Sequence, residues 1–277
     1  MENRTVALIY DFDGTLSPAN MQEFGLIQTF GKEDPQVFWK KSSDLSEEND
    51  ASEILCYMKT MIDEARISGQ SLTRENFRKF GSKVQLYSGV AEWFGKINGY
   101  GRRQGLEVEH YINSSGLTEM IEGTPIYHEF KKVYACSFLY EDGVAVWPGV
   151  AVDYTAKTQF LFKINKGVMS IRDHTQVNRF VKEKDRPVPF SRMIYFGDGA
   201  TDIPCMRLVK QFGGHSIAVY NPEGGDGHRK ASERLLTEER VHFVCPADYT
   251  EGGRIFQVVT AIIDKIKADS DLERLKG

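Results

Sequence analysis

The sequence predicts an α/β protein built on a parallel sheet, with a smaller helical module inserted into the chain. Two observations favour this class. Short apolar, β-branched segments alternate with segments of helical character, as in chains made of strand–helix–strand units. Several apolar segments also end in small or acidic residues, as parallel strands do when they present polar groups at one sheet edge. The expected core is therefore Rossmann-like, and 277 residues suffice for it and the added module.

The first expected strand is Thr5–Tyr10, an apolar run that suits a strand buried on both faces. Segments of similar character cover residues 109–113, 193–196, 216–220 and 241–244. Helices are expected between most of these strands, over residues 90–103, 177–184, 203–212 and 232–239. A last helix is expected over residues 253–267, where large apolar side chains recur at helical spacing.

Residues 18–87 contain no convincing strand and are expected to form a helical module directly after the first strand. Amphipathic patterns cover residues 21–29, 52–67 and 73–84. The polar segment 42–50 is expected to be a solvated loop. We therefore predict a core made of residues 1–17 and 88–277 and a helical domain made of residues 18–87.

Two further segments stand outside the alternation. Residues 127–147 alternate apolar and polar side chains around Asp142-Gly143, which predicts a hairpin that either gates a site or is purely structural. The glycine-rich segment 224–227 is expected to be a flexible turn rather than a phosphate cradle, because no clear helix follows it.

Composition excludes several classes of protein. Hydrophobic content of 41%, charged content of 27% and a net charge of −4 give no reason to expect nucleic acid or an anionic membrane as a partner. The four cysteines are scattered without a C-x-x-C pair, which argues against zinc or a disulfide framework. The first residues lack signal-peptide character and no apolar run has membrane-spanning length, so a cytoplasmic location is expected. The oligomeric state is not predicted.

Reactive polar groups follow three of the expected strands. Asp11 and Asp13 follow the first, Ser114 and Ser115 the second, and residues 197–202 the third. The carboxyl ends of parallel strands meet at one edge, where ligands bind. Two carboxylates buried there would cost several kcal/mol each without a metal ion or a reacting electrophile to compensate their charge. The sequence therefore predicts a reaction centre at this edge.

These segments resemble the motifs of the haloacid dehalogenase superfamily of phosphohydrolases. The matching residues are Asp11-Phe12-Asp13-Gly14-Thr15, Ser114, a lysine, and Gly197-Asp198-Gly199-Ala200-Thr201-Asp202. The helical insert resembles the cap of the phosphoserine-phosphatase-like branch. The resemblance implies a Mg²⁺-dependent phosphatase that hydrolyses a small phosphorylated metabolite through an aspartyl-phosphate.

The residues fit the roles that this resemblance implies. Asp11 is ionised at neutral pH and can attack phosphorus without an activating base. Asp13 would protonate the leaving oxygen and later activate water, which requires a raised pKa. Asp11, the backbone carbonyl of Asp13, and Asp198 would hold Mg²⁺, with Asp202 behind them or as an outer ligand. Asp202 also suits the N-cap of the helix that follows it, and both roles are compatible.

The phosphate group would be held by the second and third motifs. Ser114 and nearby N–H groups suit phosphate oxygens, and Ser115 would replace Ser114 if the register shifts by one. Gly14 and Thr15 belong to the same expected phosphate-binding group. A lysine should neutralise the charge shared by Asp11 and the phosphoryl group. Lys157 matches the family placement best, while Lys163 and Lys166 stay open.

Several alternatives remain at this stage. A phosphotransferase or mutase would use the same nucleophile with another acceptor, and a binding protein could keep the fold without catalysis. A dehalogenase is disfavoured by Asp13, because a halide needs no protonation. The phosphate ester is open: Asn20 stands near the position where phosphoserine phosphatases carry a glutamate, and Glu23 comes later. The aromatic residues of the insert, Trp39 and Tyr57 among them, are expected to form its core.

Overall fold

Seven strands form one sheet in the computed structural model, which describes residues 4–31 and 34–275. The strand order is β4-β3-β2-β1-β5-β6-β7, and every described pair except β3–β4 is parallel. The bounds are β1 Thr5–Tyr10, β2 Glu107–Leu117, β3 Lys132–Glu141, β4 Val144–Val150, β5 Met193–Gly197, β6 His215–Tyr220 and β7 Phe243–Pro246. The predicted α/β class with a parallel sheet is confirmed. The first residues, on which the expectation about a signal peptide rests, lie outside the described part.

The strand β1 occupies the centre of the sheet, as its composition predicts. It pairs with β2 on one side and β5 on the other, and its residues from Val6 onward are buried. Its bounds match the predicted segment. The last strand, β7, begins two residues later than predicted, although the N–H of His242 already donates to the carbonyl of Ser216.

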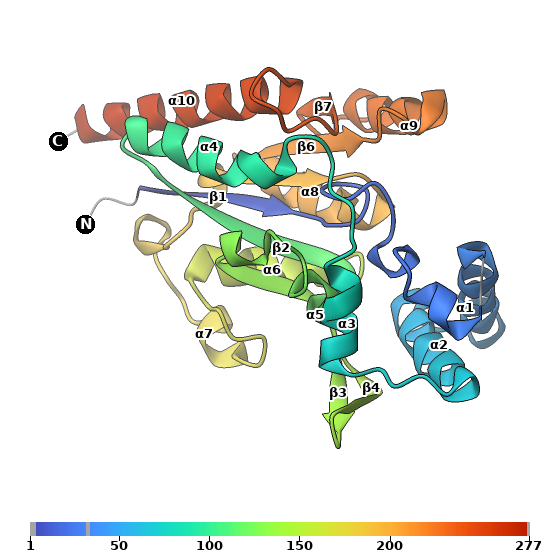
Figure 1. Cartoon of the computed structure of the whole chain (residues 1–277). Helices are drawn as coiled ribbons and strands as arrows, with labels where there is room; N and C mark the ends of the chain where they lie inside the picture. The colour runs from blue at the N-terminus through green and yellow to red at the C-terminus, as the bar shows by residue number, and fades with distance from the viewer. Residues whose placement is uncertain (1–3, 32–33, 276–277) are drawn as a thin grey trace.

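Helices cover both faces of the sheet. On one face α4 (Val90–Arg103) and α10 (Arg254–Leu275) contact each other and run across the same side (Figure 1). Trp93 of α4 donates to the Tyr10 hydroxyl, so alternate residues of β1 point to this face. On the other face α6 (Ala156–Lys166) contacts α8 (Ile203–Gln211), while α9 (Gly225–Thr237) packs on β6 and β7.

The predicted hairpin is present, with Asp142 and Gly143 both at positive φ in its turn. It is not an interruption of the fold, because β3 also pairs in parallel with β2 and so continues the central sheet. Between β2 and β3 lie α5 (Thr118–Ile121) and a single 3-10 turn, η3 (Tyr127–Glu129). The hairpin therefore forms the edge of the core.

The inserted segment is helical, as predicted. Its elements are η1 (Met21–Glu23), η2 (Ile27–Phe30), α1 (Pro35–Asn49), α2 (Glu53–Ser68) and α3 (Arg74–Gly81). Helices α1 and α2 pack on each other at one end of the molecule (Figure 1). By contrast α3 packs on α5, where a Cβ on Gly81 would lie 1.9 Å from the Met120 carbonyl oxygen. The domain boundaries at residues 17 and 87 remain a prediction.

The polar segment 42–50 is helical rather than a loop, which corrects the sequence prediction. It forms the second half of α1, whose start is fixed by Asp34 as N-cap and Pro35 in the first turn. The buried stripe of this helix contains Phe38, Ser42 and Ser46 at four-residue spacing. Because serine supplies small but not apolar side chains, the stripe left no hydrophobic signal in the sequence.

Three other expectations need correction. The helix expected over residues 177–184 is a short α7 (His174–Asn178) and a 3-10 turn, η4 (Glu183–Asp185), because Lys166 Nζ binds the carbonyls of Val177 and Arg179. Residues 21–29 form the two short 3-10 turns, not an α-helix. The glycine-rich segment begins α9, whose packing on β6 and β7 offsets the low helix propensity of glycine. None of the described helices has the length and apolarity needed to cross a membrane.

Candidate active site

A cavity of about 850 Å³ opens at the carboxyl ends of β1, β2 and β5. The core contributes Asp11, Asp13, Ser114 and Asp198 to its wall, and the helical insert contributes residues from η1, α1 and α2. The sequence predicted this meeting of strand ends. Residues of the core and of the insert therefore line the same cavity.

The chain turns sharply after β1, and the turn depends on a glycine. The carbonyl of Phe12 accepts from the N–H groups of both Leu16 and Ser17. Gly14 has φ +74°, and a Cβ there would lie 2.0 Å from Oδ2 of Asp198. The glycine therefore provides the backbone conformation and also the space for the carboxylate that comes from the end of β5.

Lys157 lies between two buried carboxylates. Its Nζ is 2.9 Å from Oδ2 of Asp11 and 2.8 Å from Oδ1 of Asp202. Burial lowers the pKa of this lysine, but the two carboxylates outweigh that effect and raise it above its ordinary value. Lys157 therefore stays charged, although it is fully buried.

Only one of the three candidate lysines, Lys157, reaches Asp11. Lys163 donates to the carbonyls of Ser170 and Asp173, and Lys166 donates to those of Val177 and Arg179. Both therefore fix the segment after α6. Of the three lysines, the contacts therefore favour Lys157 as the partner of Asp11.

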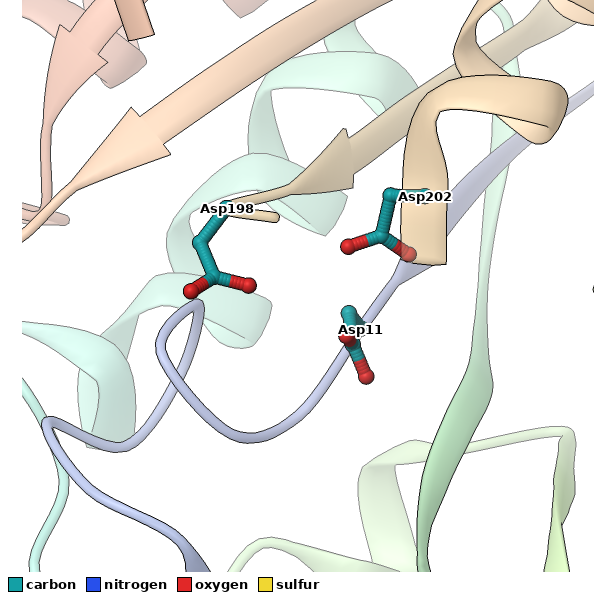
Figure 2. A group of neighbouring side chains, drawn as sticks. All are labelled: Asp11, Asp198 and Asp202. Carbon is teal, nitrogen blue, oxygen red and sulfur yellow. The ribbon is translucent and has the colours of Figure 1, made fainter. Parts of the chain in front are cut away.

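Three carboxylates converge beside this lysine (Figure 2). One oxygen from each of Asp11, Asp198 and Asp202 lies within 4.8 Å of the others. Oδ2 of Asp202 is buried and has no hydrogen-bond donor. An unpartnered buried carboxylate oxygen needs a cation or proton, and an all-oxygen set suits a hard ion such as Mg²⁺. The residues present therefore fit the expected metal.

The pKa values of Asp198 and Asp202 are both raised. Burial, followed by the charge of Asp11, raises the pKa of Asp202 to about 7. The side chain of Asp198 is exposed to the cavity, but the protein atoms around it still remove part of its hydration. This partial desolvation and the charges of Asp11 and Asp202 raise the pKa of Asp198. The cluster thus favours binding of a cation.

Asp13 is not one of these three carboxylates, and its hydrogen bond is to the backbone of the insert. Its Oδ1 accepts from the backbone N–H of Met21, at 2.9 Å. Burial and then the charge of Asp11 raise its pKa well above the ordinary value. A carboxyl whose pKa is raised in this way is a better proton donor than an ordinary aspartate.

The end of β2 is irregular where phosphate binding was expected. The pairing register shifts between Asn113 and Leu117, and Ser114 Oγ accepts from the N–H of Gly116. Ser114 and Ser115 both line the cavity, and the Ser115 hydroxyl is buried without a partner. Gly14 lines the cavity as well. Thr15 does not, because it is fully buried and its carbonyl accepts from Tyr249.

Sequence reasoning missed several residues that support the site. Tyr195 donates to Oδ1 of Asp202, at 2.7 Å, and Asn113 donates to the carbonyl of Lys157. The signal that could have identified them in the sequence is a tyrosine and an asparagine within otherwise apolar strands. Trp39 and Tyr57 line the cavity rather than only filling the core of the insert. Nothing in their local sequence distinguishes them from the neighbouring aromatic residues.

Comparison with solved structures supports the fold described above. No protein-family model matches the sequence. An uncharacterized protein of Borreliella burgdorferi is 28% identical, covering 91% of this chain and 94% of its own length. Many solved structures also match, among them the following two.

One of them is a phospho-aspartyl intermediate analogue of phosphoserine phosphatase, with a TM-score of 0.52, 15% identity and coverage of 93% of this chain and 99% of its own. The other is a HAD family hydrolase of Salmonella enterica serovar Typhi, with a TM-score of 0.57, 13% identity and coverage of 88% and 68%. The chain therefore has the fold of these haloacid dehalogenase phosphohydrolases.

Proposed function

We propose that the protein is a phosphatase of the haloacid dehalogenase superfamily. It hydrolyses a small phosphate monoester through an aspartyl-phosphate on Asp11 and requires Mg²⁺. The observation that carries the proposal is the contact of Asp11 with a buried, charged Lys157, next to an acid of raised pKa. The similarity in fold to a phosphoserine phosphatase solved as a phospho-aspartyl analogue supports the same chemistry.

Asp11 is held in position for attack on phosphorus. Lys157 donates to Oδ2 and the backbone N–H of Phe12 donates to Oδ1, at 2.7 Å. These two donors fix the carboxylate plane, and the ammonium charge offsets negative charge that develops during phosphoryl transfer. An oxygen of Asp11 forms the new bond to phosphorus while the bond to the leaving oxygen breaks.

Asp13 moves the protons in both half-reactions. In the first it donates its proton to the leaving oxygen, so an alcohol departs rather than an alkoxide. In the second, the resulting carboxylate takes a proton from water as water attacks phosphorus. The bond to Asp11 then breaks, phosphate leaves, and Asp13 is protonated again. A dehalogenase would not need this acid.

The charge balance of the site supports a metal cofactor. Asp11 and Asp202 share the one ammonium of Lys157, and the Asp198 carboxylate lies beside them, so a phosphate dianion needs another cation to bind. Asp11, Asp198, Asp202 and the backbone carbonyl of Asp13 would hold Mg²⁺. The ion supplies positive charge to the phosphate oxygens. Gly14, Ser114 and Ser115 are the proposed phosphate contacts on the protein side.

The direct test is hydrolysis of p-nitrophenyl phosphate with and without Mg²⁺. We expect wild-type turnover with Mg²⁺, its loss with EDTA, and inorganic phosphate as the product. Asp44→Asn, at a carboxylate that pairs with Lys40 on α1, serves as the control for changes at Asp11. Transfer of the phosphoryl group to an added alcohol would favour the phosphotransferase instead. Failure to hydrolyse any phosphate ester would favour a binding protein.

A further inference from the structure

One wall of the cavity takes no part in the proposed phosphoryl transfer. Among the described lining residues, Asn221 follows β6, and His228 and Ser232 belong to α9. In Figure 1, α9 lies above the end of β1, whereas α1 and α2 of the insert lie below it. Tyr87 lines the same cavity where the chain returns from the insert to the core. We call these four residues, Tyr87, Asn221, His228 and Ser232, the polar wall.

The hydroxyl of Tyr87 is buried and has no hydrogen-bond partner among the described residues. Burial, followed by the charges of Asp198 and Glu223, raises the pKa of this tyrosine. The hydroxyl is therefore protonated and lies within electrostatic range of both the proposed metal site and the turn after β6. A buried polar group without a partner costs free energy, which a ligand recovers by bonding to it.

Ser232 presents a second hydroxyl without a protein partner. The residue is 2% exposed and lines the cavity from α9. Within the described part of the chain its hydroxyl forms no hydrogen bond, although Thr237 on the same helix bonds to the carbonyl one turn earlier. A ligand can therefore bond to this hydroxyl without displacing a protein group. Beside β6, Oδ1 of Asn221 accepts from the N–H of Glu223, which orients the amide.

The ring of His228 packs on the backbone at the start of its own helix. A Cβ on Gly224, the N-cap of α9, would lie 2.8 Å from both Cγ and Cδ2 of this ring. Gly224 has a φ of −77°, so its backbone conformation does not require glycine. What this glycine provides is space for the ring, which is thus held against the backbone on the cavity wall.

The polar wall consists of two hydroxyls, an amide and an imidazole, which are groups that both donate and accept hydrogen bonds. From β6 onward, none of the described lining residues is an aspartate, glutamate, lysine or arginine. Alcohol hydroxyls have the same dual character, so they match these groups better than a carboxylate or an ammonium does. From this match and the unpartnered hydroxyls we infer that the polar wall binds the leaving group of the substrate, and that this leaving group is an uncharged polyhydroxy alcohol. The inference rests on the proposed phosphatase function.

The test compares phosphate esters of one chain length, assayed with the whole protein and Mg²⁺. Sorbitol 6-phosphate carries a hydroxyl on every free carbon, hexyl phosphate has none, and 6-phosphogluconate has a carboxylate in place of the terminal alcohol group. A cavity of about 850 Å³ accommodates molecules of this size. We expect kcat/KM for sorbitol 6-phosphate to exceed that for each of the other two by at least about tenfold.

Substitutions in the polar wall locate the effect. Tyr87→Phe and Ser232→Ala should each lower kcat/KM for sorbitol 6-phosphate by about three- to tenfold, mainly through KM, and reduce its advantage over hexyl phosphate. Tyr87→Phe should leave the urea midpoint unchanged, because its hydroxyl has no partner to lose. Tyr134→Phe, which removes a bonded hydroxyl outside the cavity lining, should lower the urea midpoint and retain the advantage.

Two glycines at the start of α9 provide a matched pair. Gly224→Ala should displace the His228 ring and reduce the advantage of sorbitol 6-phosphate, whereas Gly227→Ala has open space around the added Cβ and should retain it. An equal or higher kcat/KM for hexyl phosphate or 6-phosphogluconate overturns the inference, and so does an advantage that survives Tyr87→Phe, Ser232→Ala and Gly224→Ala. Hydrolysis of p-nitrophenyl phosphate without an advantage for sorbitol 6-phosphate overturns only the inference. No hydrolysis of any phosphate ester overturns the proposed function.

Discussion

Nζ of Lys157 lies 2.9 Å from Oδ2 of Asp11, and the two side chains are 0% and 8% exposed. The same ammonium reaches Asp202, so one charge joins α6, the end of β1 and the start of α8. A buried ammonium of this kind is tolerated because both carboxylates compensate it, and each carboxylate in turn depends on it. Lys157 therefore contributes both to the candidate active site and to the stability of the core.

Lys157→Met should abolish turnover and lower the free energy of unfolding by about 3–5 kcal/mol, because it leaves two buried carboxylates without their partner. Urea unfolding monitored by circular dichroism measures the second effect. Lys163→Met is the matched control, since Lys163 is also buried but binds only carbonyls. Lys163→Met should lower the free energy of unfolding, but the folded protein should have the kcat of the wild type. Unchanged stability in Lys157→Met would contradict the account.

Gly14→Ala should impair catalysis because its Cβ would displace the Asp198 carboxylate. We expect a higher Mg²⁺ concentration for half-maximal turnover and a lower kcat/KM. Gly143→Ala is the control for backbone strain, since it has a similar φ of +80° and open space around the added Cβ. Both variants should lose about 1–2 kcal/mol of stability from the left-handed conformation. Equal activity of the two would show that the space at Gly14 is not needed.

Tyr57→Phe should loosen the contact between the insert and the end of β2, where we propose that phosphate binds. The Tyr57 hydroxyl donates to the carbonyl of Ser115, at 2.8 Å, so its loss should raise KM and cost about 1 kcal/mol of stability. Tyr134→Phe removes an equivalent bond, to the carbonyl of Val168 far along the chain. It should cost similar stability without changing KM. The same KM in both variants would contradict this role for Tyr57.

Much of the fold and site follows from the sequence, for physical reasons. A six-residue apolar run with β-branched residues favours a doubly buried strand, so β1 was predicted to the residue, and the meeting of strand ends follows from parallel topology. The helix over residues 42–50 was missed because Ser42 and Ser46 form its buried stripe. Side-chain contacts between distant segments, such as Tyr57 with Ser115, leave no periodic signal. The part of the cavity wall that the insert forms therefore could not be predicted from the sequence.

His110 should make stability depend on pH. Burial lowers its pKa to about 3, and its ring nitrogens lie near the Tyr10 hydroxyl and Asn98 Oδ1. Between about pH 6.5 and 3 the unfolded state binds a proton that the folded state does not, so this histidine reduces stability as pH falls, by about 1.4 kcal/mol per unit. Denaturant unfolding at several pH values should show a shallower slope in His110→Gln. The exposed His128→Gln should keep the wild-type slope, and identical slopes in all three proteins would refute the assignment.

Phosphorylation of Asp11 can be detected by acid quenching of the protein during turnover of p-nitrophenyl phosphate, followed by peptide mass spectrometry. We predict one phosphoryl group on the peptide that contains Asp11, sensitive to hydroxylamine, and none in Asp11→Asn. Asp44→Asn should be phosphorylated like the wild type. Steady hydrolysis by Asp11→Asn, or turnover by the wild type with the phosphoryl group on another residue, would contradict this prediction.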